Sequence, residues 1–233
     1  MSRAPGVGEP ASAPYPGSMD RSPPPILPTY PGLDIVSDER VWNGRFPLDR
    51  VRFRHRRFDG AQSGVRTWEL WRRGRAAAML PYDPAKDVVV LIEQFRLPAL
   101  AAGLDPILTE LPAGLCNREE PPEATIRREV TEEMGLSPGR LMKVSDILLT
   151  PGGADELCAL FVGEIAAPEA DPSGLCGRAG LADEEEDIRL RAWPAQRAID
   201  AALEGQITNS VAAIALLWFQ ARRERVRSAW GAA

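Results

Sequence analysis

The pattern of apolar and polar positions divides the chain into a polar N-terminal stretch, a short β-rich stretch and a longer mixed stretch. Residues 1–31 hold nine of the 22 prolines, with Gly, Ala and Ser between them and almost no periodic apolar residues. Such a composition cannot bury enough surface to offset the entropy lost on ordering, so a disordered Pro-rich tail is predicted there. Met19 is an alternative to Met1 as the natural start.

Residues 32–75 are predicted to form a small antiparallel β subdomain. The segments "VRFRHRRF" and "VRTWELWRR" alternate apolar and polar residues, and "DGAQSG" between them has the composition of a turn. The unit is short for an independent domain, so we expect it to pack on another surface, such as a second subunit.

Residues 76–227 are predicted to form one mixed domain of strands interrupted by a few helices. Strands are expected at "AAAMLPYD", "DVVVLIEQFRL", "LMKVSDILLT", "LCALFVGEI" and "IRLRAW", which are rich in β-formers. Two helices are expected near the C-terminus, in "PAQRAIDAALEGQI" and from about Asn209 to Arg227. Residues 228–233 are left as a C-terminal tail.

A further helix is predicted between two prolines and a glycine. Pro121 and Pro122 suit a first helical turn, and Gly135 suits the left-handed position that follows a helix end. Apolar residues that recur every four positions would face the core: Ile126, Val130 and Met134.

Composition and charge argue against several classes of function. A formal net charge of -5 and a pI of about 5.2 argue against a general nucleic-acid binder, which needs a basic face. No apolar run approaches the roughly 18 residues of a membrane span. Three cysteines without a CxxC pair favour reduced thiols and a cytoplasmic location. The chain has one histidine, His55, so catalysis is expected to depend on carboxylates and not on histidine.

Three glutamates, Glu129, Glu132 and Glu133, lie within five positions of the predicted helix. Residues three or four apart share a helix face, where like charges cost about 0.2–0.5 kcal/mol a pair. Arg128 can form an ion pair with Glu132, four positions later. On the helix alone two interpretations remain: a solvated acidic face, or a site for Mg²⁺ or Mn²⁺, whose charge removes the repulsion.

The stretch "GLCNREEPPEATIRREVTEEMGL" resembles the complete Nudix box. It has Gly114, five residues, Glu120, seven residues and then a run from Arg128 to Leu136 with all the family's fixed positions. At average residue usage, a chance match is on the order of 10⁻⁷. The metal site is therefore favoured over the solvated face.

The resemblance to the Nudix hydrolases implies a fold and a metal site. The expected fold is an α/β/α sandwich with a mixed sheet, preceded by a β subdomain that relatives exchange across a homodimer. Mg²⁺, with Mn²⁺ as an alternative, is expected to bind Glu129, Glu133 and the carbonyl of Ala113. Glu132 and Glu120 would support the site, and Glu133 with Arg128 would form the part of the catalytic set inside the box.

Two segments after the box resemble the ADP-ribose pyrophosphatases of this family. Pro151, in "TPGGADE", lies fifteen residues past the box, and "GLADEEEDIRL" resembles their mobile acidic loop. The resemblance implies Glu184 as the base that activates water and Glu186 as a further metal ligand. Glu185 is the residue that a shift of one position would implicate.

The same resemblance implies a set of substrate contacts. Arg96, in "EQFRL", is expected to bind pyrophosphate or ribose, because a guanidinium can bind phosphate through two hydrogen bonds. Phe46, in "NGRFPLD", would stack on adenine from the partner subunit. Trp68 stands where the family often has an arginine, so stacking by Trp68 or a contact from Arg66 is expected instead. The remaining expected contacts are Arg45, Glu69, Arg73, Leu115, Thr150 and Glu156.

These expectations combine into one predicted function with two alternatives. The predicted reaction is Mg²⁺-dependent hydrolysis of ADP-ribose to AMP and ribose 5-phosphate by a homodimer, without nucleic-acid or membrane partners. The departure at Trp68 keeps open a pyrophosphatase for GDP-mannose or another nucleotide sugar. A sensor that binds ADP-ribose without cleaving it is the second alternative, although none of the box carboxylates is lost.

Overall fold

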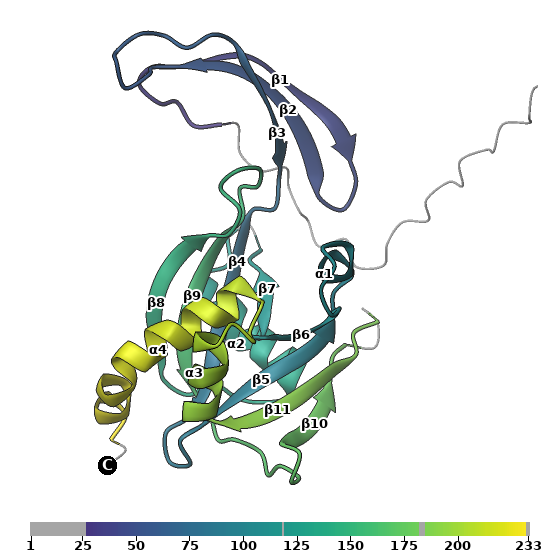
Figure 1. Cartoon of the computed structure of the whole chain (residues 1–233), viewed down its shortest axis with the longest axis vertical. Coiled ribbons are helices and arrows are strands. Elements are labelled where there is room, and N and C mark those ends of the chain that lie inside the picture. Colours follow the sequence, from purple (N-terminus) through teal and green to yellow (C-terminus); the bar gives the residue numbers. More distant parts are fainter. Residues whose placement is uncertain (1–26, 118, 182–184, 232–233) are drawn as a thin grey trace, which may run out of the picture.

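The computed structural model describes residues 27–117, 119–181 and 185–231. These residues form two sheets that follow one another along the chain, and residues 72–74 connect them (Figure 1). Met19 and the predicted tail, apart from residues 27–31, lie outside the described residues. No described helix is both long and apolar enough to cross a membrane.

The smaller sheet is antiparallel, with the order β1-β2-β3. β2 and β3 overlap the two segments that the sequence pattern predicted, whereas β1 was not predicted because most of its residues are exposed and its pattern is weak. Figure 1 shows this sheet standing away from the rest of the molecule. The three strands are β1 (Leu33–Asn43), β2 (Pro47–His55) and β3 (Arg66–Trp71).

The larger sheet has the order β10-β11-β5-β4-β9-β8, with β6 paired to β5 and β7 paired to β4. β4 and β9 are parallel and the other pairings are antiparallel, so the sheet is mixed, as predicted. Its strands are β4 (Arg75–Asp83), β5 (Val88–Phe95), β6 (Ile107–Glu110), β7 (Ala113–Leu115), β8 (Leu141–Leu148), β9 (Leu157–Glu164), β10 (Leu175–Ala179) and β11 (Ile188–Pro194).

Helices cover both faces of this sheet. Successive side chains of a strand point to opposite faces, so β4 supplies apolar residues to both. On β4, Ala78 and Leu80 pack in one core cluster with α3 (Ala195–Leu203) and α4 (Ser210–Ala229). Ala77 and Met79 pack in a second cluster with α2 (Pro122–Met134). The predicted α/β/α sandwich is therefore confirmed. The short helix α1 (Leu97–Ala101), between β5 and β6, was not predicted.

The C-terminal helix runs further than the sequence pattern indicated. Its cap is the predicted Asn209, whose side chain accepts a hydrogen bond from the Ala212 N–H. α4 continues to Ala229, and Trp230 is 7% exposed, with its ring near that of Tyr82. Residues 228–230 of the predicted tail thus belong to the packed domain.

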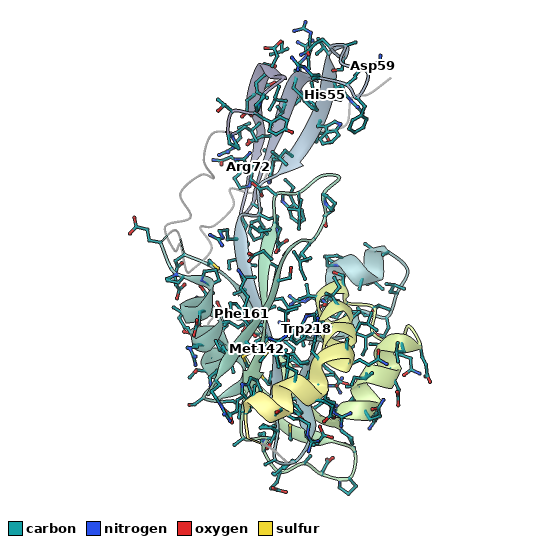
Figure 2. All side chains as sticks on the ribbon, turned by 90° about the vertical axis from the view of Figure 1, so that its left-hand side faces the viewer. His55, Asp59, Arg72, Met142, Phe161 and Trp218 are labelled. Atoms are coloured by element: carbon teal, nitrogen blue, oxygen red, sulfur yellow. The ribbon has the colours of Figure 1, made fainter. Side chains whose placement is uncertain are left out.

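A buried group of charges lies where the two sheets meet. Arg72 is 6% exposed and lies between Asp49 of β2, at 3.6 Å, and Asp155, at 3.2 Å. The backbone of Trp71 exchanges hydrogen bonds with Gly153 and Asp155, so the "TPGGADE" loop is docked on this connection. Figure 2 places Arg72 at the junction and His55 at the far end of the smaller sheet.

Candidate active site

The Nudix-box helix presents its glutamates beside the core, as its sequence predicts. α2 begins after Pro121 and ends at Gly135, whose φ of 66° is the left-handed conformation that glycine adopts without strain. Ile126, Val130 and Met134 are at most 4% exposed. The adjacent stripe therefore carries the carboxylates along the edge of the packed interface.

Glu133 is a buried carboxylate surrounded by other carboxylates. It is 7% exposed and accepts a hydrogen bond of 3.1 Å from the Ala113 N–H. Burial, followed by the charges of Glu129 and Glu186, raises its pKa to about 9. Burial also raises the pKa of Glu129. Negative charge is thus disfavoured here unless a cation is present to compensate for it.

The loop at β7 approaches the helix so closely that only glycine fits. A Cβ on Gly114 would lie 1.9 Å from Glu129 Oε1, far inside van der Waals contact. β7 is fixed in turn by pairing with β4, where Ala113 lies opposite Ala78. The absence of a side chain at residue 114 therefore lets the Glu129 carboxylate lie against the backbone that bears the Ala113 carbonyl.

Arg128 holds three of the acidic residues in place. Its guanidinium lies 2.7 Å from Glu132, 3.0 Å from Glu129 and 3.4 Å from Glu120. Burial alone would lower the pKa of Arg128, but these carboxylates raise it, so its charge is secure. These contacts make Arg128 a positioning residue. One of them is an ion pair with Glu132, the predicted supporting ligand.

The acidic loop brings one of its predicted members to this site. The negative charge of Glu186 helps to raise the pKa of both Glu129 and Glu133, so Glu186 lies near both. Its Oε2 accepts a hydrogen bond of 3.3 Å from the Leu181 N–H, across the base of the loop. Glu185 has a φ of 55°. Glu184, the predicted base, lies outside the described residues.

These residues fit a divalent cation of the Mg²⁺ type. Within the described part of the chain, no three acidic, histidine or cysteine side chains form a ready metal cage. Mg²⁺ takes one or two carboxylates and completes its shell with water and substrate phosphates. Glu129, Glu133 and the Ala113 carbonyl would hold the ion, and Glu186, whose charge acts on both glutamates, would assist.

A second group of predicted residues gathers at the junction of the two sheets. The Arg73 guanidinium lies 3.9 Å from the Phe46 ring centroid and 4.8 Å from that of Trp71. It also donates hydrogen bonds of 2.9 and 3.1 Å to Glu156. Arg45 lies 5.6 Å from the Phe46 ring centroid. Phe46, expected to stack on adenine from a partner subunit, thus lies beside Arg73 of its own chain, and its contact with adenine stays a prediction. This aromatic–arginine cluster offers flat apolar faces and fixed charges, which suit a nucleoside.

Other predicted contacts lie beside these two groups or apart from them. Leu115 is in β7 and packs on the core, and Thr150 is an exposed residue at the start of the docked loop. Trp68 and Glu69 are on β3, within the smaller sheet. Trp68 packs edge-on against Phe53, with ring centroids 5.5 Å apart, so the chain as described does not bring it to either group.

The register of β4 connects the two groups. Its pairing partners in order are Leu115 at Ala76, Gly114 at Ala77 and Ala113 at Ala78. Arg73 is four positions before Ala77, and it precedes the first residue of β4, so the two lie at most about 14 Å apart along the chain. A molecule with a nucleoside at the aromatic–arginine cluster can therefore extend along the start of this strand toward Glu129 and Glu133.

Comparison with known proteins agrees with this geometry. The NUDIX domain model matches residues 72–206. The chain belongs to the Nudix family. It is 40% identical over 198 residues to the ADP-ribose pyrophosphatase of Escherichia coli K12, covering 85% of this chain and 92% of that protein. It is 36% identical over 201 residues to the Haemophilus influenzae ADP-ribose pyrophosphatase, covering 85% and 90%.

More distant Nudix relatives and one solved structure also match. A GDP-mannose pyrophosphatase of Klebsiella pneumoniae is 31% identical over 189 residues, which cover 81% of this chain and 91% of that protein. A crystal structure of an ADP compounds hydrolase aligns with a TM-score of 0.57 at 19% identity, over 84% of this chain and 98% of that one. The structural match supports the fold.

The structure adds residues to the Nudix site that the sequence pattern did not reveal. Glu110 is 4% exposed and binds Arg96, and Asn209 binds Glu110 in turn. Trp71 joins the aromatic–arginine cluster. A charged residue inside the apolar segment "ILTELPAGL" could have indicated Glu110, because a buried carboxylate requires partners.

Proposed function

We propose that this Nudix hydrolase cleaves the pyrophosphate bond of ADP-ribose to give AMP and ribose 5-phosphate, with Mg²⁺ as its cation. The observation that carries the proposal is the pair of box glutamates: Glu129 lies against Gly114, and the buried Glu133 accepts from Ala113 N–H, beside the start of the strand β4 that follows the aromatic–arginine cluster. The 40% identity to an ADP-ribose pyrophosphatase supports ADP-ribose as the substrate.

The residues of this chain bind and orient the substrate and move a proton. The cation, when bound, neutralises the pyrophosphate and polarises the attacking water. Arg96 provides a fixed positive charge for a phosphate oxygen, while Phe46 and Arg73 provide a surface for the nucleoside. Glu184 accepts the proton of the attacking water. Glu186 serves as a further ligand.

The proposal includes a homodimer joined through the smaller sheet. This sheet carries large apolar side chains that are between 39% and 66% exposed, namely Ile35, Val36, Trp42, Trp68 and Trp71. Several large apolar side chains left exposed on so small a sheet favour an interaction site there. Association with a second copy would cover these side chains and bring Trp68 and Glu69 to the partner's substrate, where the chain as described leaves them apart.

GDP-mannose is the second candidate substrate. Trp68 replaces the arginine that the family often carries there, and GDP-mannose pyrophosphatases are 31% identical to this chain. The lower identity makes it the weaker candidate. The reaction and the metal site would be the same, and only the nucleoside contacts would differ.

Steady-state kinetics with both substrates test the proposal. The kcat/KM for ADP-ribose is expected to exceed that for GDP-mannose, and both are expected to depend on Mg²⁺ and to vanish with chelator. A higher kcat/KM for GDP-mannose would transfer the proposal to that substrate. Metal-dependent binding of ADP-ribose without cleavage would show that the protein is a sensor and would refute the proposed hydrolysis.

A further inference from the structure

Glu110, at the end of β6, is a buried carboxylate that, among the described residues, accepts its hydrogen bonds from side chains. Its Oε2 accepts from Arg96 Nε at 2.9 Å and lies 2.8 Å from Arg96 Nη2. Its Oε1 accepts from Asn209 Nδ2 at 2.9 Å. Glu110 is 4% exposed, so these partners replace the water that the carboxylate has lost.

The backbone of Arg96 is fixed on both sides. Its N–H donates to the Pro106 carbonyl at 2.7 Å, and its own carbonyl accepts from the Ala99 N–H at 3.0 Å. The backbone contacts leave the long side chain unrestrained, and Glu110 restrains it by contacting two of its three nitrogens. Among the described residues the third, Nη1, has no hydrogen-bond partner, and the Arg96 side chain is 45% exposed.

The Glu110 carboxylate lies close in sequence to the metal site. Two residues, Leu111 and Pro112, separate Glu110 from Ala113, and the Pro112 carbonyl accepts a hydrogen bond of 3.2 Å from Met79 N–H. The segment from β6 to β7 is thus anchored to the central strand β4. A shift of Glu110 would be transmitted both to Arg96 and to the loop that faces Glu129.

Asn209 connects this carboxylate to the far helix layer. Its Oδ1 accepts a hydrogen bond of 2.9 Å from the Ala212 N–H and so caps α4. Its amide nitrogen donates to Glu110. A serine at this position would keep a capping oxygen but would lack the amide donor, which separates the two roles of Asn209.

We propose that Glu110, held by Asn209, is a positioning residue that aims the free edge of the Arg96 guanidinium at the pyrophosphate of the substrate. The inference rests on the proposed function only for the identity of the substrate, and it applies to any nucleoside diphosphate cleaved at this site. Without Glu110, Arg96 stays charged but can rotate, so it contacts the pyrophosphate in fewer of the enzyme–substrate complexes.

The first test is a double-mutant cycle. Glu110→Gln keeps the shape but turns an NH₂ group toward either Arg96 or Asn209, because an amide has a single acceptor oxygen. A misaimed catalytic contact can lower kcat/KM by about 100-fold. We expect Glu110→Gln and Arg96→Ala each to lower kcat/KM strongly and the double variant to fall no further than Arg96→Ala. Asn209→Ser is expected to cause a smaller fall.

The matched control is Glu164→Gln. Glu164 also holds one arginine, Arg140, by hydrogen bonds of 2.6 and 2.7 Å, but it lies at the opposite end of β9 from the junction. Its loss is expected to leave kcat/KM unchanged. Additive effects of Glu110→Gln and Arg96→Ala would overturn the proposal, because a residue that acts through Arg96 has nothing left to do once Arg96 is removed.

A second readout does not depend on catalysis. The ¹⁵N NMR resonance of Arg96 Nε–H, assigned by its loss in Arg96→Lys, is expected to be protected from exchange in the wild type and in Glu164→Gln. It is expected to broaden or disappear in Glu110→Gln while the backbone spectrum stays folded. An unchanged resonance in Glu110→Gln would overturn the positioning role. Failure to cleave ADP-ribose would count against the proposed function and would leave this measurement intact.

Discussion

Replacing Glu133 by glutamine removes one charge from the candidate metal site and almost nothing else. Glutamine has the same shape, and its carbonyl oxygen can still accept the hydrogen bond from Ala113 N–H. The side chain is 7% exposed, so the packing around it determines the position of the replacement. The variant therefore separates the charge of Glu133 from its volume.

The size of the effect follows from the role of the charge. Stabilisation of the developing charge by a bound cation contributes several kcal/mol to catalysis. A loss of about 3–5 kcal/mol corresponds to a fall in turnover of about 10²–10⁴-fold. Without metal, the variant is expected to be at least as stable as the wild type, because burial, followed by the charges of Glu129 and Glu186, disfavours an ionised Glu133, and a neutral amide avoids this cost.

Two assays on Glu133→Gln check the two halves of this prediction. AMP release at saturating ADP-ribose and Mg²⁺ measures turnover, and thermal unfolding in chelator measures stability. Addition of Mn²⁺ is expected to raise the unfolding temperature of the wild type more than that of the variant. Turnover within threefold of the wild type would refute the assignment of Glu133 as a metal ligand. A large loss of stability in chelator would show that the carboxylate has a structural role instead.

Three further variants test other parts of the structure. Gly114→Ala places a Cβ 1.9 Å from Glu129 Oε1, so we expect a higher Mg²⁺ requirement and kcat/KM lowered about tenfold or more, measured by metal titration. Arg73→Ala removes its contact with the Phe46 ring, and steady-state kinetics should show KM raised about tenfold with a smaller change in kcat. Burial raises the pKa of Asp87, but hydrogen bonds from Arg223 and then Tyr82 outweigh this effect. The pKa of Asp87 therefore lies below its ordinary value. A depressed pKa stabilises the fold above the ordinary value of roughly 4, so Asp87→Asn should cost about 1.5–3 kcal/mol in urea unfolding at pH 7. The difference should shrink as the pH falls below 4, and a constant difference would contradict it.

Local rules predicted the parts of the site that lie on one element. The limits of α2 follow from Pro121 and Gly135, and its buried face follows from a period of four. The glutamate stripe and the Arg128–Glu132 pair need only helix geometry. The Nudix box could therefore be located and oriented before its surroundings were known.

Contacts between distant segments could not be predicted in this way. Arg73 and Glu156 are 83 residues apart, and Glu110 and Asn209 are 99 residues apart. Their pairing depends on how the "TPGGADE" loop docks and on how α4 lies across the sheet. The strand β1 escaped prediction because most of its residues are exposed on both faces, which removes the alternation that marks a half-buried strand.

The most direct test of the central claim is a ³¹P NMR time course of ADP-ribose with the purified protein, with Mg²⁺ and with chelator. Hydrolysis of the pyrophosphate bond predicts that its resonances are replaced by two phosphomonoester resonances of equal intensity, from AMP and ribose 5-phosphate, only when Mg²⁺ is present. Unchanged pyrophosphate resonances with Mg²⁺, or cleavage at the same rate in chelator, would contradict a metal-dependent ADP-ribose pyrophosphatase.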